Sequence, residues 1–73
     1  MLKREEVERI KQQYPKGTPI RLYSMEGEQT VPPGSRGVVE HVDDIGQIHM
    51  KWENGSHLAL NVEEDRFEII TQQ

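Results

Sequence analysis

The sequence predicts a mainly β domain in which a short N-terminal α-helix packs on a five-stranded barrel. Two observations support this prediction: the apolar spacing changes from three or four residues to two after Gly17, and turn-forming residues divide the remainder into short segments. A chain of 73 residues has room for a single core. We therefore expect one domain, with the helix in residues 1–14 and the barrel in residues 15–73.

The helix is predicted by an apolar stripe near the N-terminus. Val7, Ile10 and Tyr14 recur at spacings of three and four, and charged residues occupy most positions between them. Pro15 lacks an amide hydrogen and disfavours helical dihedrals at Tyr14, so the helix should end by Gln13 or Tyr14. Because so short a helix is marginal alone in water, its stripe should pack on the barrel.

The strands are predicted by alternating apolar residues. Ile20 and Leu22 share one face of a first strand, and a long loop over residues 24–35 closes with a Pro-Pro-Gly turn. Further strands should cover residues 36–42, 47–52 and 56–60. Residues 61–65 form a single turn before a last strand in which Phe67 and Ile69 face inward.

The register around Asn54-Gly55 can be tested by burial. A two-residue loop would send Leu58 and Leu60 to solvent, whereas a three-residue loop with a glycine bulge pairs residue 52 with 56, 50 with 58, and 48 with 60. Only the second register buries every large apolar side chain. The resulting order of elements is that of an SH3-like barrel, and an open meander covered by the helix is the alternative.

Charge and composition limit the class of protein. The net charge is −4, residues 1–23 carry +3, and residues 24–73 carry −7, so the body is acidic. There is no cysteine, no apolar run long enough to span a bilayer, and no apolar region behind the basic N-terminal residues. We expect a soluble cytoplasmic protein that does not enter membranes.

Five short motifs, taken together, resemble a small bacterial and mobile-element family known as a domain of unknown function (the DUF4314 type). They are Tyr-Pro-x-Gly-Thr at residues 14–18, Val-Pro-Pro-Gly at 31–34, Asp-Asp-x-Gly-x-Ile-His at 43–49, Trp-x-Asn-Gly at 52–55 and Asp-Arg-Phe at 65–67. The likeness covers residues 14–70. A weaker similarity to KOW, Tudor and Mib-Herc2 modules implies binding of proteins or nucleic acids, by analogy of fold.

A protein-binding surface is the leading functional hypothesis. In SH3-like barrels aromatic rings line a groove beside the first long loop, where extended peptides dock. The candidate binding residues are Tyr14, Tyr23, Met25, Pro33 and Arg36. Trp52 shares a face with Ile48 and Met50 and is expected in the core, and the helix is positioned either to leave the groove open or to block it. The expected partner is a protein, with a homodimer as one alternative.

A nucleic-acid accessory domain of a mobile element is the second hypothesis. Its phosphate-facing residues would be Lys3, Arg4, Lys11, Lys16 and Arg21, together with Arg36. The acidic body disfavours this hypothesis, because phosphate binding draws on dense Lys and Arg.

Neither a metal site nor a catalytic site is expected. His41, His49 and His57 lie on consecutive predicted strands, and His41 and His49 should stand side by side on the outer face. Without Cys ligands or a His-x-x-x-His pair, and with Lys51 nearby, they fit solvent-facing histidines better than zinc ligands. The acidic runs at 43–44 and 63–65 fit solvated turns. We expect no cofactor, no metal and no enzymatic activity.

Overall fold

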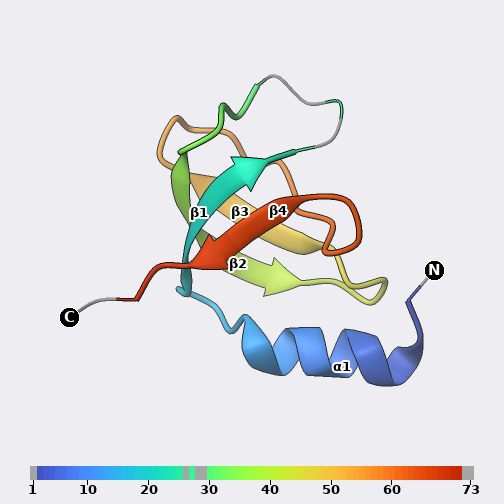
Figure 1. Ribbon diagram of the computed structural model, residues 1–73. Helices are drawn as coiled ribbons and strands as arrows, with labels where there is room; N and C mark the ends of the chain where they lie inside the picture. The colour runs from blue at the N-terminus through green and yellow to red at the C-terminus, as the bar shows by residue number, and fades with distance from the viewer. Residues whose placement is uncertain (1, 26, 28–29, 72–73) are drawn as a thin grey trace.

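The computed structural model describes residues 2–25, 27 and 30–71 of the chain. This part contains one helix, α1 (Arg4–Gln13), and four strands, β1 (Pro19–Ser24), β2 (Arg36–Val42), β3 (Ile48–Trp52) and β4 (Arg66–Ile69). All neighbouring strands are antiparallel, and the sheet order is β3-β2-β1-β4 (Figure 1). The mainly β class and the N-terminal helix are therefore as predicted.

The predicted five-stranded barrel is not shown, because the described strands form an open sheet of four. Residues 56–60 make one isolated bridge, between Ile48 and Leu60, rather than a strand. The predicted register nevertheless holds at both ends: the Trp52 amide donates to the Ser56 carbonyl at 2.9 Å, and the Ile48 amide donates to the Leu60 carbonyl at 2.9 Å.

Leu58 explains why no ladder forms between these two ends. Its carbonyl accepts a hydrogen bond from Trp52 Nε1 at 2.9 Å, and its amide donates to Ser56 Oγ at 3.2 Å. Two side chains thus bind the backbone groups that a further strand would use to pair with Met50. The structure is closer to the open meander covered by a helix, with β4 returning beside β1.

Helix α1 ends at Gln13, as the sequence predicts, and begins at Arg4, inside the predicted residues 1–14. The Lys3 amide donates to Glu6 Oε1 at 3.0 Å at its start, and the Tyr14 amide donates to the Ile10 carbonyl at 3.0 Å at its end. Val7 and Ile10 are buried, and the helix lies below the sheet in Figure 1. No helix in the described residues is long and apolar enough to cross a membrane.

The core lies between the sheet, α1 and the segment around Leu60. Seven side chains are almost completely buried: Ile20, Leu22, Val31, Val39, Ile48, Met50 and Leu60. Trp52 is 2% exposed, which confirms that it belongs to the core. A Cβ atom on Gly37 would lie 2.8 Å from Trp52 Cε3, so the indole can pack against β2 only because residue 37 is glycine.

The two predicted turns form as expected. Ser35 donates its amide to the Pro32 carbonyl at 3.1 Å, and Gly34 between them has a φ of 88°. Gly55 donates to the Trp52 carbonyl at 3.0 Å with a φ of 90°, as a glycine bulge requires.

One inward-facing residue was predicted wrongly. Ile69 lies opposite Ile20 in the sheet, yet it is 43% exposed, whereas Phe67 is partly buried against the core. The reason is position: β4 is the last strand of an open sheet, so its side chains are covered on one side only.

Candidate functional site

The predicted protein-binding residues lie in different surroundings. The Tyr14 ring packs on Phe67 at 5.7 Å between centroids, where it fixes the end of α1 against β4. Tyr23 is 51% exposed on β1, and a hydrogen bond with the Glu68 carboxylate raises the pKa of its hydroxyl. The Tyr14 ring therefore packs against Phe67, whereas the Tyr23 ring is half exposed to solvent.

Of the other three predicted residues, Pro33 lies beside the end of β1, because the amide of Gly34, which follows it, donates to the Leu22 carbonyl at 2.7 Å. Met25 is partly buried against the core, and Pro33 is exposed in its turn. Arg36 is exposed at the start of β2 and lines a hollow of about 430 Å³, which Val38, Lys51 and Trp52 also line. Of the five residues, Tyr14 packs against Phe67 and Arg36 lines this hollow, and a groove shared by all five stays a prediction.

The predicted phosphate-facing residues are partly neutralised by acids. Lys11 Nζ lies 3.0 Å from Asp44 Oδ1, and this hydrogen bond raises the pKa of Lys11. Arg21 Nη1 lies 3.8 Å from Glu68 Oε1. Lys3, Arg4 and Lys16 are exposed. Two of the five positive charges therefore already face a carboxylate of the same chain.

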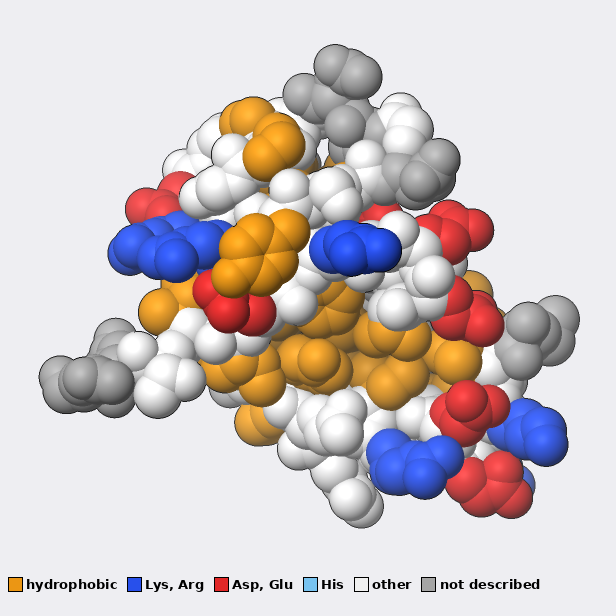
Figure 2. Space-filling model, viewed as in Figure 1, with side chains coloured by type: hydrophobic (Ala, Val, Ile, Leu, Met, Phe, Trp, Pro, Cys, Tyr) orange, Lys and Arg blue, Asp and Glu red, His pale blue; other side chains and the backbone are white. Residues whose placement is uncertain are grey.

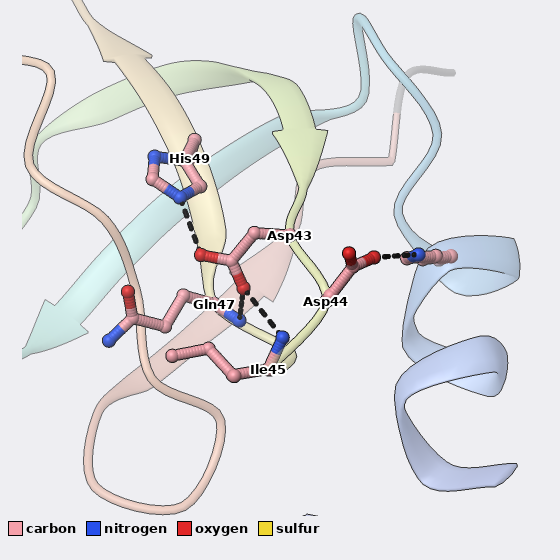
Figure 3. A network of polar contacts seen from close by, with 6 residues as sticks. Asp43, Asp44, Ile45, Gln47 and His49 are labelled. Carbon is pink, nitrogen blue, oxygen red and sulfur yellow. Dashed lines mark hydrogen bonds and ion pairs between the residues drawn. The ribbon is translucent and has the colours of Figure 1, made fainter. Parts of the chain in front are cut away.

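Asp43 organises the turn between β2 and β3. Its Oδ1 accepts hydrogen bonds from the amides of Ile45 at 3.1 Å and Gln47 at 2.9 Å, and its Oδ2 lies 2.8 Å from His49 Nε2 (Figure 3). Desolvation works to raise the pKa of Asp43, but the bonds from His49, Gln47 and Ile45 outweigh it and lower that pKa. The neighbouring Asp44 reaches the other way, to Lys11 on α1, so this turn joins the helix to the hairpin.

The histidines have the arrangement that the sequence predicts. His41 and His49 stack with ring centroids 4.3 Å apart and planes 7° from parallel. His57 Nδ1 lies 3.2 Å from Glu40 Oε1. Within the described part of the chain, no three His, Asp or Glu side chains are grouped so that they could hold a metal ion. The carboxylate partners of His49 and His57 hold the strands in place.

The open edge of β4 is a feature that the sequence analysis missed. Ile70 donates its amide to the Pro19 carbonyl at 2.9 Å, and Glu68 lies opposite Arg21. In an antiparallel ladder the backbone groups of alternate residues point the same way. Those of Phe67 and Ile69 therefore point away from β1, toward the side of the sheet where no further strand is found among the described residues.

An apolar groove lies beside this edge. Figure 2 shows hydrophobic side chains gathered between β4 and α1. A hollow of about 250 Å³ there is lined by apolar Leu2, Ile10, Tyr14 and Val62 and by polar Glu6, Arg9 and Gln13 of α1. Tyr14 in turn contacts Phe67. The backbone groups of β4 and this groove together make an elongated surface, which we call the β4 edge: Phe67, Ile69, Tyr14, Val62 and Leu2.

One signal in the sequence points to this surface. Arg66-Phe67-Glu68-Ile69 alternates charged and apolar residues over a short segment, as a strand with one solvated face does. The alternation shows which side chains face the core, but it does not show that the strand has only one neighbour. That depends on the order of the strands in the sheet.

Comparison with known proteins gives the family and nothing more specific. The family model described as domain of unknown function (DUF4314) matches residues 3–70, which includes α1 as well as the segment that carries the five motifs. No curated protein and no solved structure matches the chain significantly. Since the family model covers nearly all of the 73 residues, the chain belongs to the family of domains of unknown function DUF4314.

Proposed function

We propose that this chain is a small, non-catalytic protein-interaction module that binds an extended polypeptide segment along the β4 edge. The observation that carries the proposal is the outward direction of the Phe67 and Ile69 backbone groups beside an apolar groove. An extended segment added to a sheet edge gains main-chain hydrogen bonds, and its alternate side chains fill neighbouring pockets.

The shape of the fold supports this proposal. We propose that the open sheet is a reduced SH3-like barrel, in which residues 56–60 bridge to β3 while β4 stays uncovered. Native proteins commonly protect an edge by keeping it short, and β4 has only four residues. A short edge favours a weak and reversible partner. The absence of cysteine supports a reducing compartment such as the cytoplasm.

The nucleic-acid alternative has less support. The carboxylates beside Lys11 and Arg21 reduce the positive charge available to phosphates, and the net charge of the chain is −4. No observation favours an accessory role on nucleic acid over protein binding.

Amide exchange measured by NMR tests the proposal, with short peptides selected from a displayed library as the probe. In the free protein the Phe67 and Ile69 amides should exchange faster than those of Glu68 and Ile70, which face β1. A bound peptide should slow exchange at Phe67 and Ile69.

Two variants of one residue provide the matched control. Ile69→Pro removes the outward amide and the side chain, whereas Ile69→Ala removes most of the side chain and keeps the amide. We expect peptides to lose at least about tenfold in affinity for Ile69→Pro relative to Ile69→Ala. Equal affinity for the two variants, or peptides that protect amides elsewhere, would contradict the proposal.

A further inference from the structure

We infer that the partner at the β4 edge is a second copy of this chain, paired antiparallel through β4 with the two Phe67 residues opposite each other. The inference rests on the proposed function and names the occupant of the same site. It comes from the charge pattern of the strand: Arg66 and Glu68 flank Phe67, and both are exposed.

The register follows from elementary pairing rules. Backbone groups point outward at Phe67 and Ile69, so a pair of identical antiparallel strands can be centred on residue 67, 68 or 69. Centring on Glu68 sets two like charges directly opposite each other, which is unfavourable. Centring on Ile69 sets Glu68 opposite the apolar Ile70. Only the register centred on Phe67 sets Arg66 opposite Glu68 of the second copy. The two-fold symmetry of the pair makes this contact twice.

The apolar surface supports the same arrangement. In the register centred on Phe67, the two Phe67 rings lie on one face of the joined sheet, beside the two Tyr14 rings that already contact them. Ile69, which is 43% exposed in one chain, comes to lie opposite Asp65 of the second copy, so this register also sets an apolar residue beside a carboxylate. The two Arg66–Glu68 attractions are what distinguish it from the register centred on Ile69. Association covers the apolar side chains that a single chain leaves at the border of its core.

The strength of the contact is limited by its length. Interfaces of stable dimers bury at least about 1,200 Å², and a pair of four-residue strands supplies only part of that area. We therefore expect a dimer in rapid exchange, with a dissociation constant on the order of 100 µM.

Charge reversal with sedimentation at several protein concentrations tests the inference on the full chain. Arg66→Glu places a carboxylate opposite Glu68 of the second copy and should weaken dimerisation at least about tenfold, because two attractions become two repulsions. The double variant Arg66→Glu with Glu68→Arg restores opposite charges and should dimerise again. Equimolar Arg66→Glu and Glu68→Arg single variants should associate with each other more tightly than either does with itself.

The results distinguish peptide binding at the β4 edge from pairing with a second copy of the chain. If the wild-type chain stays monomeric up to millimolar concentration while selected peptides still distinguish Ile69→Pro from Ile69→Ala, the second copy is ruled out and the proposed function stands. If neither peptides nor a second copy bind at the β4 edge, both are ruled out. A dimer that Arg66→Glu leaves unchanged would place the contact elsewhere and overturn the inference. Since Glu68 also pairs with Arg21, the Arg66→Glu result decides by itself if Glu68→Arg fails to fold.

Discussion

The two edges of the sheet differ in how far the rest of the chain covers them. At the β3 edge, residues 56–60 run alongside and satisfy the Ile48 and Trp52 amides, and Leu60 closes the core with no exposed surface. At the β4 edge, Phe67 and Ile69 direct their backbone groups outward, and Ile69 is nearly half exposed. The β3 edge is closed by its own chain, and the β4 edge has no neighbouring strand among the described residues.

This difference shows that an irregular segment closes an edge as well as a strand does. Three backbone hydrogen bonds and the Trp52 side chain join residues 56–60 to β3, although no regular ladder forms. What protects an edge is satisfaction of its amides and burial of its side chains. The β4 edge lacks both among the described residues, and this contrast leads to different expectations for substitutions on the two sides.

The largest difference is expected between alanine substitutions at the two edges. Leu60→Ala should lower the free energy of unfolding by about 2–5 kcal/mol, because Leu60 is fully buried and its loss leaves a cavity. Ile69→Ala should cost about 1 kcal/mol, since much of that side chain already contacts water. Urea unfolding of both variants at low protein concentration measures the difference. Equal losses would mean that the β4 edge is as closed as the β3 edge.

Most of the fold could be predicted from local patterns. Apolar spacings of three and four residues located α1, and alternation of apolar residues located the strands. The bulged turn at Asn54-Gly55 was chosen because it buries Leu58 and Leu60, and the structure confirms this turn. Each of these features depends on residues close together in the sequence. The missing strand could not be predicted this way, because apolar spacing does not show that the Trp52 side chain binds the Leu58 carbonyl in place of a backbone amide.

The candidate site was less predictable for a related reason. The five predicted binding residues came from an analogy with barrels whose groove lies beside the first long loop. In the structure the Tyr14 ring packs on Phe67. The β4 edge exists because β1 is the only strand beside β4 in the described part of the chain, and a missing neighbour leaves no mark on the sequence of β4 itself. In contrast, the stacked pair of His41 and His49 followed directly from strand register.

A smaller effect is expected from Trp52→Phe, which tests how the β3 edge is closed. The substitution keeps an aromatic ring but removes Nε1, so the Leu58 carbonyl loses its donor. We expect a loss of about 1–3 kcal/mol in the free energy of unfolding, with faster amide exchange at Leu58. Tyr23→Phe on the β4 side is the matched control, because it also removes one polar atom from an aromatic residue and Tyr23 is half exposed. If both variants lose the same stability, the indole hydrogen bond is not what holds residues 56–60.

The smallest expected effect depends on pH and concerns the turn that leads into β3. Asp43→Asn keeps an oxygen for the Ile45 and Gln47 amides but removes the charge beside His49, and should cost about 1 kcal/mol near neutral pH. The pKa of Asp43 is lowered in the folded state relative to 3.8, so its ionised form stabilises the fold above that value. As the pH falls from 3.8 through the folded pKa, the contribution should disappear.

Comparing wild type with Asp43→Asn isolates this contribution, because the titrations of all other groups largely cancel in the difference. Urea unfolding between about pH 6 and about pH 2 should therefore give a stability difference that is constant at the upper end and shrinks as the pH falls below 3.8. Ile69→Ala on β4 adds and removes no titratable group, so its stability difference from wild type should stay constant over the same range. A difference between wild type and Asp43→Asn that stays constant down to about pH 2 would mean that the Asp43 charge does not support the β3 side of the sheet.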